Sequence, residues 1–328
     1  MSKNKKNNSF KLDRKQIAIG FFAIIFLALI FFLSRNIDFS NKEGKSSKEI
    51  NENSYNSSKI MRVDLDEIKT INLDLKTCDV RIQESSTNPY VEYTNLYKDD
   101  LSYEVKSKYK DGNLKLSSDI KGKELYMKNK IQIVRIFLPK NKKLESVKLN
   151  LGAGDVKVTS LVSDDIDFKL ESGNVSFENS KISGSVANNA GSILVKKSEL
   201  KNSNLNTKTG NIIVTDTKLQ ADGKMQSQNG DIKIKTKDSI KSFKINARLN
   251  VGNFVLGNVS YRNILDGYTS GKNKKKSLDL KTDVGDILFN QSDENAIKEE
   301  EFINVSSPDS NENSDSNEEN INMNEGNN

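Results

Sequence analysis

The sequence predicts an all-β protein built as a parallel β-solenoid, of the right-handed β-helix type, with about 19 residues per rung. A ten-residue unit recurs in which Gly followed by Asp, Asn or Ser separates two short runs of alternating apolar residues. Counting from this Gly, the positions five before, two after and four after are apolar in all eight copies, if Cys78 takes the glycine place in the first. Period-two alternation indicates short strands with one buried face. Such units bury a core only when they stack on one another.

The first element is an expected transmembrane signal anchor at residues 17–34. Ile17 to Leu33 carries no charge and spans about 25 Å as a helix, close to the thickness of a bilayer core. Because six basic residues precede it, residues 1–16 are predicted to be a short cytoplasmic tail and the bulk of the chain extracytoplasmic. The expected location is therefore the cell membrane, with a single span. A cleaved signal peptide is the alternative, although no small-x-small site follows Leu33.

The next elements are a linker and a cap. Residues 35–59 are rich in Ser, Asn, Lys and Glu, which is typical of a flexible spacer. Residues 60–146 contain several strand patterns, and Asp111-Gly112 marks a hairpin turn between two of them. This region is expected to form an antiparallel sheet that caps the first rung of the solenoid.

Residues 147–290 hold the repeats, with residues 257–276 as an insertion before the last copy. An antiparallel meander with the same turn chemistry is the alternative, but the near-constant spacing between successive turn glycines favours the solenoid. Tyr261 and Tyr268 flank the insertion and are expected either to anchor it or to contact a partner. The turn glycines are Gly154, Gly173, Gly191, Gly210, Gly230, Gly252 and Gly285.

The chain ends in an acidic tail at residues 291–328. This tail is rich in Asn, Glu, Ser and Asp and is predicted to be disordered. It is interpreted as a solvated terminus, with an electrostatic gate that folds back on the basic body as the alternative.

These motifs resemble the DUF4097 family of candidate bacterial adhesins. The resemblance covers about residues 60–290 and rests on LDLKTCDVRI at 73–82, IQIVRIFLPKNKKLESVKLNLGAGDVKV at 131–158, and the serial Gly-Asp and Gly-Asn strands. It implies an extracytoplasmic β-solenoid, often tethered to the membrane and linked to envelope maintenance or stress responses. It implies no catalytic residues.

Composition excludes several enzyme classes. The chain has no His, which excludes Ser-His-Asp and Cys-His hydrolases and His-ligated metals, and one Cys, which excludes an intrachain disulfide. We therefore expect no catalytic residues, no metal, no cofactor and no small-molecule substrate. The Asp, Asn and Ser residues beside the glycines are expected to serve the turns rather than to bind Ca²⁺. A β-helix enzyme acting on polysaccharide, using Asp164, Asp165 and Asp167, is the remote alternative.

Two surfaces are predicted to make contacts. A basic body outside a membrane attracts anionic wall polymers or anionic lipid, whereas the compartment and the absence of an aromatic platform argue against nucleic acid. Leu194 and Ile213 fall on the outward side of adjacent rungs, where they are expected either to pack under a loop or to form an apolar patch for an envelope protein. The lysines expected to contact polyanions are Lys196, Lys197, Lys233, Lys235, Lys272, Lys274, Lys275 and Lys276.

The function predicted from the sequence is thus a non-enzymatic binding or sensing module of the cell envelope. A structural or adhesive surface spacer is the alternative.

Overall fold

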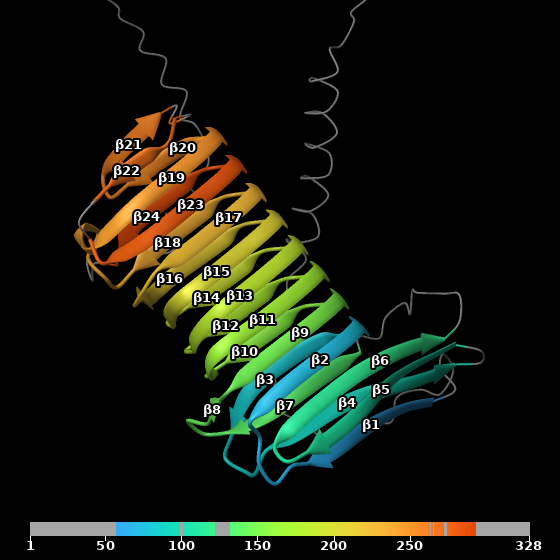
Figure 1. Cartoon of the computed structure of the whole chain (residues 1–328). Helices are drawn as coiled ribbons and strands as arrows, with labels where there is room; N and C mark the ends of the chain where they lie inside the picture. Colours follow the sequence, from blue (N-terminus) through green and yellow to red (C-terminus); the bar gives the residue numbers. More distant parts are fainter. Residues whose placement is uncertain are drawn as a thin grey trace, which may run out of the picture. The chain divides into compact units, whose positions relative to one another are not determined.

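The computed structural model describes residues 57–98, 101–121, 132–262, 264, 266–271 and 274–292, and these form an all-β fold (Figure 1). Its single helix is the short 3₁₀ turn η1 (Ile240–Ser242). Within these residues no helix has the length and apolarity needed to cross a bilayer. The expected anchor at 17–34, the tail at 1–16, most of the linker and all but the first two residues of the acidic tail lie outside them.

Each rung consists of one strand before the corner glycine, here called the A strand, and one after it, the B strand. A strands pair in parallel with A strands and B strands with B strands, as in the register Phe168↔Val186 and Val175↔Ile193. The parallel pairing confirms the solenoid-like arrangement over the antiparallel meander. The A strands are β2 (Thr70–Thr77), β9 (Ser146–Ala153), β11 (Val162–Ser172), β13 (Lys181–Ala190), β15 (Glu199–Thr209), β17 (Gly223–Asn229), β19 (Phe243–Val251) and β23 (Lys276–Val284). The B strands are β3 (Asp79–Ser85), β10 (Val156–Thr159), β12 (Val175–Glu178), β14 (Ile193–Lys196), β16 (Ile212–Leu219), β18 (Ile232–Thr236), β20 (Asn253–Leu256) and β24 (Ile287–Gln291).

The order of the strands along the stack differs from their order in the sequence at both ends. Strands β23 and β24 pair on one side with β17 and β18 and on the other with β19 and β20, so the last rung in sequence is the second-last in space (Figure 1). At the other end, β2 and β3 lie between β9 and β10 and the cap strands β6 (Asn113–Lys121) and β7 (Ile133–Pro139). The interval of 33 residues between Gly252 and Gly285 therefore reflects an end of the stack and the return from it.

The core follows the predicted apolar columns. Of the 24 positions that the repeat predicts to be buried, 23 are buried, including Leu73, Phe177 and Phe289. The exception, Leu256, is half-buried and lies on the terminal rung, where no further rung covers it. Stacked β-branched and aromatic side chains thus form one continuous core, as the repeat requires.

The glycine corner sets the close spacing of the rungs. Gly191 has φ of 135°, and a Cβ placed on it would lie 2.0 Å from the carbonyl oxygen of Gly173 on the neighbouring rung. The same contact recurs at the other six corner glycines, so the column admits no side chain. Cys78, which takes this place in the first copy, is not among the residues with positive φ.

The residue after each glycine links its rung to the next. The side-chain oxygen of Asp155 accepts a hydrogen bond from the backbone N–H of Asn174 at 2.7 Å, and that of Asn174 accepts from Ser192 at 3.0 Å. This ladder continues in the same sense from Asp79 to Asn253. The Asp, Asn and Ser column therefore satisfies backbone donors between rungs.

An inner polar column stabilises the same corner. Asn188, Thr207, Ser227 and Thr282 are buried, and each donates to the carbonyl oxygen of a corner glycine on the preceding rung, at 2.8–2.9 Å. Because these buried donors have acceptors, the column is structural.

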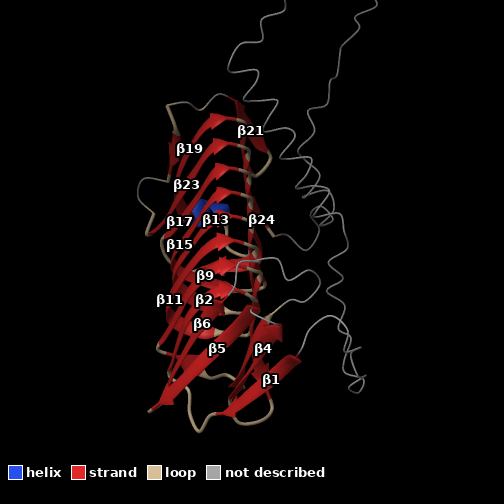
Figure 2. Cartoon of the chain, turned by 90° about the vertical axis from the view of Figure 1, so that its right-hand side faces the viewer, coloured by secondary structure: helices blue, strands red, loops and turns tan. Residues whose placement is uncertain are grey.

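The first end of the stack is closed by a sheet of antiparallel strand pairs, whose strands β6 and β7 join the first rung by parallel pairing (Figures 1 and 2). Figure 2 shows β1, β4 and β5 at one end of the stack and β19 and β21 at the other. The cap strands are β1 (Ser57–Asp64), β4 (Tyr90–Lys98), β5 (Leu101–Lys110), β6 and β7, and the short β8 (Lys143–Leu144) pairs with the start of β11.

The inserted segment closes the other end. Its strands β21 (Val259–Arg262) and β22 (Tyr268–Ser270) pair antiparallel with β20 and β19 and so protect the exposed edges. Tyr261 and Tyr268 pack against each other and on Phe254, with ring centroids 4.8–5.6 Å apart. Both tyrosines thus anchor the insertion and cover the end of the core.

Gly191→Ala is expected to lower the free energy of unfolding by at least about 3 kcal/mol, because it adds a strained backbone and a clash with a carbonyl oxygen. Gly223→Ala is the matched control. Gly223 has no positive φ, and its added Cβ would meet a flexible side-chain end of Leu278, so the expected loss is below about 1 kcal/mol. Denaturant unfolding of the full chain measures both. Equal losses would contradict the packing argument.

The Cys78 thiol is expected to resist alkylation and disulfide exchange at neutral and mildly alkaline pH. Burial raises the pKa of Cys78 to about 12, and Tyr103 lies against it, so the reactive thiolate does not form. Thiol titration of the full chain with and without denaturant measures this. A Ser86→Cys variant, in the exposed loop after β3, should react at once and supplies the control.

Candidate functional site

Five exposed lysines gather at the capped end of the stack, on the cap strands β5 and β6 and on the neighbouring A strand β9. They are Lys106, Lys108 and Lys110 on β5, Lys115 on β6 and Lys148 on β9, and we call them the lysine patch. Strand alternation positions them, because their neighbours Val105, Leu114, Leu116 and Val147 point into the core.

The hairpin turn fixes which lysines face one another. Asp111 and Gly112 both have positive φ, at 52° and 82°, which is the geometry of a tight two-residue hairpin. The resulting register places Lys108 directly opposite Lys115. Like charges in this position are destabilising.

The positive charge continues across the sheet as far as Lys148, whose other neighbour in the register is Asp167 of β11. Lys115 pairs with Asn72 of β2, and Asn72 pairs in turn with Lys148. Lys106 forms an ion pair with Asp119 at 3.6 Å. Lys108, Lys110, Lys115 and Lys148 have no ion pair among the described residues.

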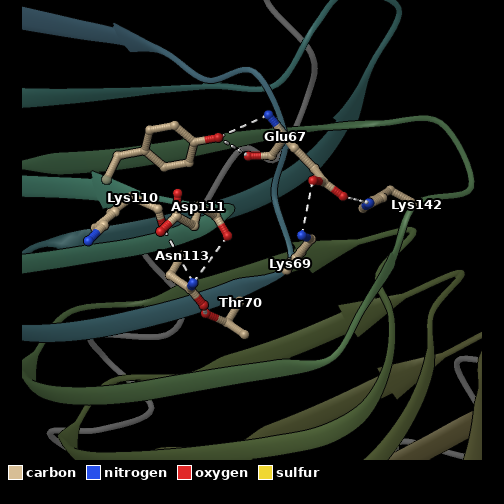
Figure 3. Close-up of polar contacts among 8 residues, drawn as sticks. Glu67, Lys69, Thr70, Lys110, Asp111, Asn113 and Lys142 are labelled. Atoms are coloured by element: carbon tan, nitrogen blue, oxygen red, sulfur yellow. Dashed lines mark hydrogen bonds and ion pairs between the residues drawn. The ribbon is translucent and has the colours of Figure 1, made fainter.

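The hairpin is held to the first rung by a polar corner, shown in Figure 3. The Thr70 hydroxyl donates to Asn113 Oδ1 at 2.6 Å, and the Asn113 amide donates to the carbonyl oxygens of Lys110 and Asp111 at 3.3 and 3.2 Å. The backbone N–H of Lys69 donates to the carbonyl oxygen of Gly112 at 2.7 Å. These bonds fix the turn that carries the patch.

Glu67 forms ion pairs with two lysines of this corner (Figure 3). Its carboxylate lies 3.2 Å from Lys69 Nζ and 3.5 Å from Lys142 Nζ, while its backbone N–H and carbonyl bond the Tyr109 hydroxyl at 3.0 and 2.6 Å. Hydrogen bonding to Lys69 holds the pKa of the Glu67 carboxyl below its ordinary value. The corner lysines are therefore paired, and the unpaired charge lies on the patch.

The lysines singled out from the sequence do not form one stripe. Lys233 is only 5% exposed and pairs with Asp231 at 3.2 Å, so its ammonium does not face a polymer. Lys276 is half-buried and pairs with Asp238 at 3.1 Å.

The other predicted lysines lie in separate places. Lys196 and Lys235 are half-buried in one outward column of the B strands, with Thr215 between them, and Lys196 makes a further contact. Lys197, Lys274 and Lys275 are exposed in turns, and Lys272 lies outside the described residues.

The predicted apolar pair is adjacent. Leu194 and Ile213 are neighbours across β14 and β16, and Leu194 is 38% exposed while Ile213 is half-buried. The acidic cluster, by contrast, is engaged in structural contacts: Asp164 with Lys143, Asp165 with Ser146, and Asp167 with Lys169. No group of three or more potential metal ligands occurs in the part of the chain described.

The lysine patch escaped the sequence reasoning, although a signal for it was present. Lys106, Lys108 and Lys110 alternate up to the Asp111-Gly112 turn, and Lys115 follows it. A two-residue hairpin pairs residues symmetrically about the turn, which places Lys108 opposite Lys115.

The family model for Toastrack DUF4097 matches residues 68–290 of this chain. The chain belongs to this family. Its Toastrack region contains every rung of the stack and the hairpin that carries the lysine patch.

Several solved structures are similar to this Toastrack chain. A candidate cell adhesion protein from Clostridium sporogenes is 18% identical, with 72% of this chain and all of that one covered and a TM-score of 0.36. A candidate adhesin from Bacteroides fragilis is 15% identical, with 71% and 98% covered and a TM-score of 0.39. A candidate lipid binding protein from Parabacteroides distasonis is 12% identical, with 72% and 97% covered and a TM-score of 0.32. Comparison with curated proteins gives no match.

Lys115→Glu is expected to raise the free energy of unfolding by about 0.2–1 kcal/mol, because it replaces a cross-strand repulsion from Lys108 with an attraction. The gain should shrink at high salt, which screens exposed charges. Lys208→Glu, at an exposed position of β15 outside the patch, is the matched control and should leave stability unchanged. Denaturant unfolding at two salt concentrations measures both variants. A loss of stability in Lys115→Glu would contradict the repulsion between Lys108 and Lys115.

Proposed function

We propose that this protein is a non-enzymatic, membrane-anchored module of the cell envelope that holds an anionic, phosphate-bearing surface through its lysine patch. The observation that carries the proposal is the opposition of Lys108 and Lys115, flanked by Lys106 and Lys110. An arrangement that costs stability is relieved when an anionic partner supplies the missing negative charge. The rigid sheet presents these ammonium groups at fixed spacing.

The anchor in this proposal rests on the sequence. Ile17 to Leu33 is apolar and preceded by lysines, which orients the Toastrack region to the outside. The linker of residues 35–56 reaches about 70 Å when extended, so the tethered module can meet either the membrane surface or the wall. Anionic headgroups and wall polymers offer the same phosphodiester chemistry, and the experiment separates them.

A second candidate function uses the other predicted surface. Leu194 and Ile213 form an apolar pair on the B strands beside Lys196 and Lys235. This chemistry suits a protein segment with apolar side chains flanked by carboxylates. An adhesive spacer requires neither surface.

The test uses the full chain in nanodiscs of neutral phospholipid. It is co-sedimented with cell-wall sacculi, with and without their anionic polymers, and separately floated with vesicles containing phosphatidylglycerol. Lys108→Gln/Lys115→Gln is expected to weaken salt-sensitive binding by about 2 kcal/mol, or about thirtyfold. The wild-type chain should bind either the sacculi with anionic polymer or the phosphatidylglycerol vesicles, and the one that it binds identifies the source of the phosphate.

The matched control is Lys208→Gln/Lys224→Gln, which removes the same charge from exposed positions outside the patch. Equal weakening in both double variants would mean that net charge alone drives binding and would contradict the patch. If the chain bound neither the sacculi nor the vesicles, an anionic surface would be ruled out as its partner.

A further inference from the structure

The outward side of the B strands, here called the B face, changes character along the stack. One column runs through Leu194, Ile213, Lys233, Leu288 and Val255 on β14, β16, β18, β24 and β20. Strand alternation points all five away from the core. Exposure nevertheless falls from 38% at Leu194 to 5% at Lys233 and 4% at Leu288. Such low exposure of outward side chains indicates that this part of the B face is not open to solvent.

The neighbouring column of the B face points to a partner with polar and acidic groups. It runs through Lys196, Thr215 and Lys235. Thr215 is 6% exposed, and its Oγ1 has no hydrogen-bond partner among the described residues. A buried hydroxyl of this kind is costly unless it bonds something. The face therefore combines apolar side chains, two lysines and an unsatisfied hydroxyl.

The chain leaves the stack at the edge of this same face. The Ser292 N–H donates to the carbonyl oxygen of Thr236 at 2.6 Å, and its hydroxyl donates to Asp216 Oδ1 at 3.2 Å. Asp216 directly follows Thr215, and Thr236 directly follows Lys235. Ser292 thus stands beside the column that holds the lysines and the unsatisfied hydroxyl.

We propose that residues 293–305 of this chain return along the B face and cover it. The segment DENAIKEEEFINV contains five acidic residues, one lysine and the apolar side chains Ala296, Ile297, Phe302, Ile303 and Val305. Its charge complements Lys196 and Lys235, and its apolar residues match Leu288, Ile213 and Leu194. From β24 to β14 is three rungs, or about 14 Å, whereas 13 extended residues reach about 45 Å.

The tail then acts as an intramolecular occupant of the apolar surface. A partner protein that uses Leu194 and Ile213 competes with the tail, whose tether gives it a high effective concentration. This inference stands independently of the lysine patch, which lies on β5, β6 and β9. Failure of one therefore leaves the other intact.

The experiment measures protection of a single introduced thiol. Ile213→Cys is made in the full chain and in a chain that ends at Ser292, and maleimide labelling is followed in both. We expect labelling in the full chain to be about tenfold slower, as for a docked state favoured ten to one. Ala187→Cys, exposed on the outward side of β13, is the matched control and should label equally in both chains. The buried native Cys78 stays unlabelled if both chains are folded.

A second variant tests the charge complementarity. Lys235→Glu in the full chain should raise the labelling rate of Ile213→Cys towards that of the shortened chain, and high salt should do the same. Equal rates in the full and shortened chains would overturn the proposal. Slow labelling of Ile213→Cys that persists in the shortened chain would also overturn it. If this protection increased with protein concentration, the occupant would be a second copy of the chain. If it did not depend on concentration, the occupant would be another segment of the same chain.

Discussion

The whole stack depends on the distance between backbones at the glycine corner. There the carbonyl oxygen of one glycine occupies the space that a Cβ of the next would need. This close approach lets the residue after each glycine reach the backbone N–H of the next rung, and lets Asn188, Thr207 and Ser227 reach the glycine carbonyls. One steric requirement thus organises two hydrogen-bond ladders and keeps the apolar columns in register.

The buried core of the repeats was predictable because the same apolar positions recur in every copy. A column of eight apolar residues is informative where a single one is not, and Leu256 departs from it only because its rung is terminal. The order of the rungs was not predictable, because every copy has the same pattern and the pattern does not identify the copy that pairs with β17. The place of β23 is decided by the insertion, which turns the chain back at the end of the stack.

The surfaces were predictable only in part. Leu194 and Ile213 were found from their repeat position, since the register of adjacent rungs follows from the glycines. Lys233 was misread as available because alternation alone cannot show what covers an outward side chain. The lysine patch depends on a hairpin register outside the repeat, so a search for repeat columns passed over it.

The out-of-order rung also bears on how the protein is made. A ribosome releases the chain from the N-terminus, and a simple solenoid can add rungs in that order. Here β19 and β20 emerge before the two strands that join them to the rest of the stack. Assembly of the last two rungs therefore waits for residue 291. A chain that ends before Lys276 lacks β23 and β24. In such a chain β17 has an unpaired edge, and the rung of β19 and β20 has no strands to pair with, so the stack forms only in chains that include the last rung.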